Sequence, residues 1–112
     1  GDYGHQTEFV IFAHKGRRHL DGGRIGNVLD GRRVPPSSLQ HPTQKPVGIL
    51  RPLILKSTAD GEVVLDPFCG SGSTGVACAE HGRRFIGIDS DPRYVQIARE
   101  RLAQDTLFGD AA

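Results

Sequence analysis

VVLDPFCGSGSTGVA, residues 63–77, is the stretch that decides the fold. It begins with an apolar, β-branched run that ends in an aspartate, and a turn of glycine and serine follows over residues 70–75. Such a run before a glycine-rich turn is typical of a buried strand, which we expect over residues 62–66. The residues after the turn predict a helix that ends at about His81.

The sequence on both sides of this stretch predicts one more strand and two more helices. RFIGID, residues 84–89, has the pattern of a strand, and an aspartate followed by a proline predicts the start of a helix over residues 91–102. Apolar residues recur at helical spacing over residues 46–57, with Pro46 at the first helical position. Pro52 predicts a kink there or a helix in two parts, because proline cannot donate the helical hydrogen bond.

Strand, glycine turn, helix and strand make a βαβ unit, whose strands are parallel and whose sheet has both faces covered. We therefore expect an α/β fold, a partial Rossmann-like arrangement of a mostly parallel sheet with flanking helices. The 112 residues suffice for one small domain. TEFVIFA, residues 7–13, predicts a further buried strand.

Charge is distributed unevenly along the chain, although the net charge is only +1. Residues 1–56 carry nine Lys or Arg against four Asp or Glu, a net of +5. Residues 57–112 carry five against nine, a net of −4. This asymmetry indicates that one part of the chain meets a polyanion, or it is an accident of a short sequence.

The composition argues against a membrane protein and against a metal site. No apolar run approaches the roughly 20 residues that span a bilayer. The first residues also lack the basic and apolar regions of a signal peptide, so we expect a cytoplasmic protein. Cys69 and Cys78 have no histidine at metal-ligand spacing, and we interpret both as packing residues.

The glycine turn indicates a nucleotide-type cofactor. Residues 70–75 fit G-x-G-x-x-G, and Asp89 lies 19 positions after Gly70, a spacing that dinucleotide-binding domains also have. Asp66 favours a different cofactor, because a carboxylate beside the turn repels a pyrophosphate and attracts the sulfonium and ammonium groups of S-adenosylmethionine. The alternative interpretation is that Asp66 only caps the next helix or accepts hydrogen bonds from loop amides.

Three motifs resemble those of the amino-methylating DNA methyltransferases. Residues 63–77, which contain LDPFCGSG, resemble the cofactor motif of that family, and FIGID, residues 85–89, resembles its next motif. HPTQKP, residues 41–46, is similar to the H-P-T-x-K-P motif of the family's β-order group, in which the catalytic motif precedes the cofactor motif. Taken without the resemblance, residues 41–46 form a proline-bracketed turn that opens a helix.

The resemblance implies an S-adenosylmethionine pocket and assigns its residues by position. The ribose hydroxyls fall to Asp89, the adenine edge to Ser90, and the carboxylate of the methionine moiety to Lys45. The full set that the resemblance assigns to the cofactor is His41, Thr43, Lys45, Asp66, Pro67, Phe68, Gly70, Gly72, Asp89 and Ser90.

The resemblance also divides the chain into three segments of a single domain. Residues 1–16 correspond to a late sheet strand, residues 17–40 to a basic loop, and residues 41–112 to a cofactor-binding subdomain. Double-stranded DNA is the implied partner, and its phosphates are expected to meet basic side chains, unless these belong to a solvated surface loop. The basic residues are Lys15, Arg17, Arg18, Arg24, Arg32 and Arg33.

The family's catalytic motif, an Asp, Ser or Asn followed by two prolines and an aromatic residue, is absent from the sequence. The one Pro-Pro pair, Pro35-Pro36, is flanked by Val34 and Ser37, which supply neither the hydrogen-bond acceptor nor the ring that stacks on a flipped base. We expect that motif before Gly1, and we expect the chain alone to be inactive. The alternative functions are a non-catalytic remnant that keeps the fold but binds cofactor weakly or not at all, and a dinucleotide-binding Rossmann module.

Two further interactions are expected, one with a sliding clamp and one between copies of the chain. QDTLF, residues 104–108, loosely resembles peptides that dock on bacterial sliding clamps, although packing of Leu107 and Phe108 on the domain is the simpler interpretation. A sheet with an exposed edge also favours self-association of the chain. The sequence does not distinguish adenine N6 from cytosine N4 as the methylated atom.

Overall fold

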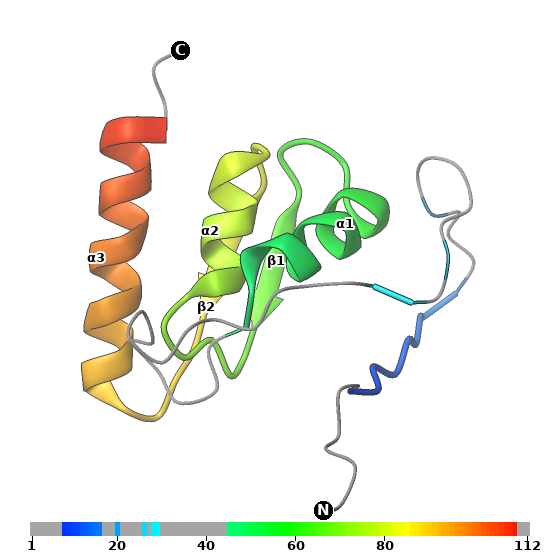
Figure 1. Cartoon of the computed structure of the whole chain (residues 1–112), viewed down its shortest axis with the longest axis horizontal. Helices are drawn as coiled ribbons and strands as arrows, with labels where there is room; N and C mark the ends of the chain where they lie inside the picture. The colour runs from blue at the N-terminus through cyan, green and yellow to red at the C-terminus, as the bar shows by residue number, and fades with distance from the viewer. Residues whose placement is uncertain (1–7, 17–19, 21–25, 27, 30–44, 110–112) are drawn as a thin grey trace, which may run out of the picture.

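The computed structural model describes residues 8–16, 20, 26, 28–29 and 45–109 of the chain (Figure 1). Its regular elements in chain order are α1 (Val47–Ser57), β1 (Val63–Asp66), α2 (Ser73–Glu80), β2 (Arg84–Gly87) and α3 (Pro92–Gly109). The predicted order of helix, strand, helix, strand and helix is therefore confirmed, with boundaries within a few residues except at the end of α3.

The two strands pair in parallel, as the βαβ pattern predicted. Val63 pairs with Arg84 and Asp66 with Gly87, so the carboxyl ends of β1 and β2 lie at the same edge. The pairing continues beyond the strands, because the Ile88 amide donates to the Asp66 carbonyl at 2.9 Å. This edge is where the glycine turn leaves β1, so the fold brings the turn next to the end of β2.

The three helices lie on one side of the sheet, with α2 between α1 and α3 (Figure 1). A small core joins this helical layer to the strands: Ile54 from α1 packs with Ala77 and Cys78 from α2. Val64 and Phe85, one from each strand, pack against that cluster. Both cysteines are buried free thiols, which confirms their interpretation as packing residues.

The opposite face of the sheet is not covered by any described residue. Its side chains are apolar yet exposed: Val63 by 44%, Leu65 by 58%, Ile86 by 54% and Ile88 by 53%. The parallel sheet with flanking helices is confirmed, but the expectation that both of its faces are covered is not met within the described part of the chain. The reason is that all three described helices pack on the face that carries Val64 and Phe85.

The strand predicted over residues 7–13 does not form in its described part, residues 8–13. Phe9 is 98% and Ile11 93% exposed, and this segment, blue in Figure 1, lies to one side of the β1–β2 pair. A β-branched and aromatic run becomes a buried strand only where neighbouring strands and a covering layer receive it. The described residues supply one strand pair, and it does not reach this segment.

Two helix boundaries differ from those predicted. Pro46 lies just before α1 instead of at its first position, and α1 continues as one helix through Pro52, so the division in two is not observed. The helix expected to end near Leu102 continues to Gly109, which places the whole predicted docking peptide, residues 104–108, in α3. Within the described residues, no helix combines the length and apolar character needed to cross a membrane.

Candidate functional site

The candidate site is the glycine turn between β1 and α2. Gly70 and Gly72 adopt positive φ angles of 51° and 86°, a region that side chains disfavour. The turn is closed by a hydrogen bond from the Gly72 amide to the Cys69 carbonyl at 2.8 Å. The Cys69 amide in turn donates to the Ile88 carbonyl at 2.9 Å, which fastens the start of the turn to the end of β2.

Glycine is required at the turn for close packing as well as for backbone conformation. A β-carbon added at Gly72 would lie 2.8 Å from the Cβ of Ala98 in α3, and one at Gly75 would lie 2.7 Å from the ring of Phe85. Real β-carbons do not approach other atoms so closely. The glycines therefore let α2 and α3 lie directly against the turn and the sheet.

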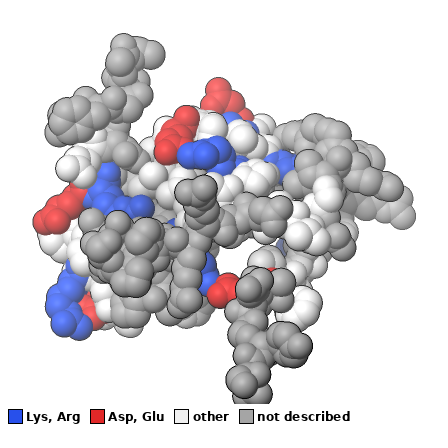
Figure 2. All heavy atoms as spheres, in the orientation of Figure 1, with Lys and Arg blue, Asp and Glu red and all other residues white. Residues whose placement is uncertain are grey.

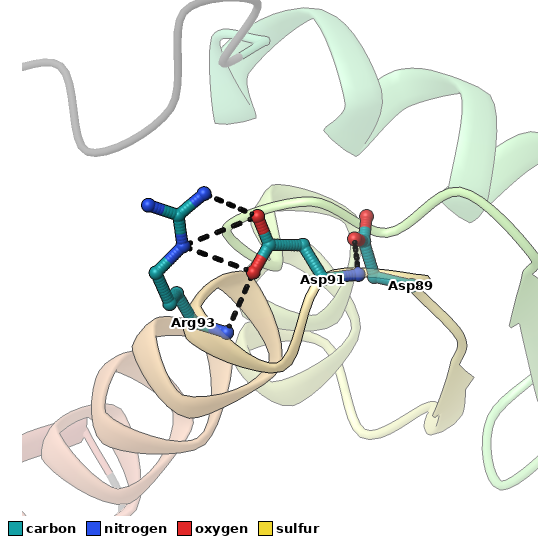
Figure 3. A network of polar contacts seen from close by, with 3 residues as sticks. All are labelled: Asp89, Asp91 and Arg93. Carbon is teal, nitrogen blue, oxygen red and sulfur yellow. Dashed lines mark hydrogen bonds and ion pairs between the residues drawn. The ribbon is translucent and has the colours of Figure 1, made fainter.

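Asp89 is held by two backbone amides at the end of β2. Its Oδ2 accepts from the Gly70 amide at 3.0 Å, and its Oδ1 accepts from the Asp91 amide at 2.9 Å (Figure 3). Each carboxylate oxygen has a second lone pair, so the group can accept further hydrogen bonds. The half-buried side chain is thus a fixed acceptor beside the turn.

Asp66, at the end of β1, is held in a similar way. Its Oδ1 accepts from the Phe68 amide at 3.0 Å, and its Oδ2 accepts from the hydroxyl of Thr74 in α2 at 2.7 Å. The alternative interpretation, in which Asp66 accepts hydrogen bonds from loop amides, is therefore consistent with the structure. These contacts leave one lone pair on each oxygen and the negative charge in place.

The start of α3 fixes the position of the Asp89 loop. Asp91 Oδ1 accepts from the Arg93 amide at 2.9 Å, which confirms the predicted capping aspartate. The Arg93 guanidinium folds back onto the same carboxylate, with Nη2 2.7 Å from Oδ2 (Figure 3). The hydrogen bond and the charge of Asp91 raise the pKa of the exposed Arg93 side chain.

The negative charges of Asp66 and Asp89 act on the turn itself. Burial raises the pKa of the Cys69 thiol above its ordinary value of 9.0, and the charges of the two carboxylates raise it further. The described residues contain no cluster of side chains that would hold a metal ion. The two carboxylates therefore give the turn a negative electrostatic environment.

Most of the predicted cofactor residues meet at this edge of the sheet. Phe68 is 87% exposed beside the turn, while Gly70 and Gly72 are buried in it. The Nζ of Lys45 is 2.7 Å from Glu8 Oε2 in an exposed ion pair. His41 and Thr43 lie outside the described residues. The residues that the structure places at or next to the turn are Asp66, Pro67, Phe68, Gly70, Gly72, Asp89 and Ser90.

The predicted DNA contacts fall almost wholly outside the described residues. Lys15 is described and exposed. The face shown in Figure 2 carries acidic and basic side chains interspersed among the described residues, with no field of one sign. The positions that lie outside the description are Arg17, Arg18, Arg24, Arg32 and Arg33.

Two side chains at the site were not predicted from the sequence. Thr74 binds Asp66, and Arg101 in α3 contacts Ser71 and Ser73 of the turn. Arg101 lies 30 residues after Ser71 in the sequence. The one signal in the sequence is that Arg101 follows Ala98 by one helical turn, which places both on one face of the helix.

A glycine turn that follows the first of two parallel strands, with a carboxylate at or just beyond the carboxyl end of each strand, is typical of nucleotide-type cofactor sites in α/β proteins. The family model of the N6/N4 DNA methylases matches residues 3–100, and the chain belongs to that DNA methylase family. It is 42% identical over 114 residues to the type II methyltransferase M2.DpnII of Streptococcus pneumoniae, covering 88% of the chain and 42% of that protein.

Further relatives give the same result. The type II methyltransferase M2.LlaDCHI of Lactococcus lactis subsp. cremoris is 40% identical over 121 residues, which cover 94% of the chain and 45% of that protein. The solved M1.HpyAVI–SAM complex matches with a TM-score of 0.65 at 35% identity, over 75% of the chain and 43% of that structure. The chain thus spans less than half the length of these relatives.

Proposed function

We propose that the chain is the cofactor-binding part of a DNA methyltransferase that transfers a methyl group from S-adenosylmethionine to an exocyclic amino group, adenine N6 or cytosine N4. The observation that carries this proposal is the pair of ordered carboxylates, Asp66 and Asp89, on either side of a glycine turn. Membership of the DNA methylase family supports it.

The chemistry of the turn fits S-adenosylmethionine better than a dinucleotide. Two carboxylates beside buried glycines favour a ligand with positive charge and disfavour a pyrophosphate. Asp89 keeps lone pairs for both ribose hydroxyls while two amides hold it in place. Ser90, the next residue, is exposed at the same edge and is assigned to the adenine edge. The M1.HpyAVI relative was solved as a complex with this cofactor.

At the methionine end we assign Asp66 to the sulfonium and ammonium charges and Phe68 to the apolar wall. Lys45 is assigned to the carboxylate of the methionine moiety, together with His41 and Thr43. The ion pair between Lys45 and Glu8 does not oppose this, because side chains exposed by 54% and 78% form a weak pair, worth about 0–1 kcal/mol. A bound carboxylate competes with Glu8 for the lysine.

The bound cofactor supplies an activated methyl group, and the residues of this chain bind and orient it. Transfer then depends on holding the methyl and the amino nitrogen in line, which is a matter of positioning. The motif that would orient the amino group is not in this sequence. We therefore propose that methyl transfer requires residues of the full-length enzyme outside these 112.

The proposed substrate is double-stranded DNA, bound through the full-length enzyme. Lys15, Arg17 and Arg18, with the basic residues up to Arg33, are assigned to the DNA backbone, because phosphate contacts need cationic side chains and carry no sequence information. Self-association and a contact of residues 104–108 with a sliding clamp are secondary proposals. A cytoplasmic location is proposed because in bacteria, where these relatives occur, the DNA lies there.

A methylation assay tests the function. The full-length protein is incubated with radiolabelled S-adenosylmethionine and double-stranded DNA, and label in N6-methyladenine or N4-methylcytosine is measured after hydrolysis. We expect one of these two bases to be labelled by the full-length protein and neither by residues 1–112 alone. Absence of both products from the full-length protein contradicts the proposal, and activity of the isolated chain contradicts the need for further residues.

A further inference from the structure

Helix α3 packs directly on the glycine turn, far along the sequence from it. Ala98 is 5% exposed and faces Gly72, at which a β-carbon would lie 2.8 Å from the Ala98 Cβ. Arg101 lies one helical turn further on the same face. Its side chain therefore extends along the turn at the point where α3 touches it.

The guanidinium of Arg101 binds three acceptors, in the turn and at the first residue of α2, through one nitrogen. Nη1 lies 2.9 Å from the carbonyl oxygen of Ser71, 3.0 Å from the Ser71 hydroxyl and 3.2 Å from the Ser73 hydroxyl. Ser71 is only 3% and Ser73 6% exposed, so water has little access to these oxygens. Buried acceptors of this kind need a donor, and a charged donor makes the stronger bond.

These contacts hold the turn at a different peptide group from the one that Asp89 binds. The Gly70 amide is fixed by the Asp89 carboxylate, and the carbonyl one residue later is fixed by Arg101. The two flexible glycines of the turn thus flank a serine whose peptide group is anchored by α3. The arginine reaches the turn from α3 through Ser71 and Ser73, while Asp89 lies just beyond the carboxyl end of β2.

We propose that Arg101 is a positioning residue for the cofactor. By fixing the Ser71 carbonyl, it holds the turn in the conformation that receives the ligand, and it acts through the turn without touching the ligand. This inference rests on the proposed binding of S-adenosylmethionine at the same turn. Under this proposal the affinity for the cofactor depends on α3. That helix lies outside the sequence motifs that form the site.

The test compares three variants of the full-length enzyme. Arg101→Gln removes the charge, Arg101→Lys keeps it, and Arg99→Gln removes the same charge from an exposed position of the same helix. We measure the Kd for S-adenosylhomocysteine by calorimetry, KM for S-adenosylmethionine and for DNA, kcat and the melting temperature. Arg101→Gln is expected to raise the Kd and the cofactor KM about tenfold, the equivalent of one lost charged hydrogen bond.

The other readouts separate positioning from a general loss of structure. We expect kcat at saturating cofactor and KM for DNA to stay within about twofold of wild type, and Arg99→Gln to match wild type throughout. Arg101→Lys is expected to restore part of the affinity. In a general loss of folded protein, kcat falls instead while the cofactor KM stays constant, and that result overturns the proposal.

A second variant links the arginine to its partner in the turn. Ser73→Ala removes one acceptor, and its effect on Kd is expected to be smaller in the Arg101→Gln background than in wild type, because the two residues act through one contact. Additive effects contradict the proposal, as does unfolding of both Arg101 variants. If wild type itself binds no S-adenosylhomocysteine, the proposed function fails; if wild type and Arg101→Gln bind equally well, only this inference fails.

Discussion

At the scale of single residues, the site depends on carboxylates whose oxygens are already ordered by the backbone. Asp89 accepts from the amides of Gly70 and Asp91, so its orientation is fixed by the turn on one side and by the start of α3 on the other. An ordered acceptor loses little conformational freedom on binding a ligand, which favours affinity.

Asp89→Asn should weaken cofactor binding about tenfold or more. Asparagine has one carbonyl oxygen and no charge, so one of the two amides and one ribose hydroxyl lose an acceptor. Calorimetry with S-adenosylhomocysteine measures the change in the full-length protein. Glu100→Gln, the same loss of charge at an exposed position of α3, is the control and should leave the Kd unchanged.

Cys69 should react slowly with iodoacetamide at pH 8 in the folded protein. Burial and the charges of Asp66 and Asp89 raise its pKa above 9.0, so the reactive thiolate is scarce. The pKa of Cys69 is higher in the folded than in the unfolded protein. The protonated thiol therefore contributes its full share of folding stability below pH 9.0, and this share is lost as the pH rises through the folded-state pKa. Peptide mapping by mass spectrometry, with and without urea, measures the rate; equal rates would show that the thiol is accessible.

At the scale of elements, the glycine turn is the joint between the sheet and two helices. Gly72→Ala should destabilise the protein by about 1–2 kcal/mol from the left-handed backbone alone, and the contact with Ala98 adds to this. Denaturant unfolding measures the change. Gly48→Ala is the matched control, since a β-carbon there meets nothing within 4 Å, and it should leave stability unchanged or raise it by up to about 1 kcal/mol. Equal effects would contradict the role of the turn.

The local elements could be predicted because each carries its own signal. The apolar run before Asp66, the glycines after it and the Asp91 cap all act within a few residues, and β1, α2, β2 and the start of α3 follow them. The contact of Arg101 with the turn could not be predicted, because it depends on how α3 packs. The strand expected over residues 7–13 is not formed in its described part, residues 8–13, for a related reason. An apolar run becomes a strand only beside neighbouring strands, and the run itself does not indicate whether these are present.

At the scale of the whole molecule, the described sheet has one covered face and one bare face. Leu65 and Ile86, on neighbouring strands, lie on the bare face with more than half of each side chain exposed. The chain spans less than half the length of the relatives it matches. Bare apolar surface of this kind favours association with other apolar surface.

Residues 1–112 in isolation should therefore self-associate as their concentration rises. Sedimentation velocity over a range of concentrations measures this. Leu65→Lys combined with Ile86→Lys should reduce the association, because two charges on the bare face oppose burial. Leu55→Lys, a lysine at an exposed leucine of α1 away from that face, should have little effect. A chain that stays monomeric without these substitutions would contradict the prediction.

The glycine turn, with Asp66 and Asp89 beside it, is proposed to bind a positively charged methyl donor and not a pyrophosphate. Calorimetric titration of the full-length protein with S-adenosylmethionine and, separately, with NAD⁺ tests it most directly. The proposed site predicts saturable binding of S-adenosylmethionine that Asp89→Asn weakens, and no heat of binding with NAD⁺. Binding of NAD⁺ in preference to S-adenosylmethionine, or S-adenosylmethionine binding that Asp89→Asn leaves unchanged, would contradict it.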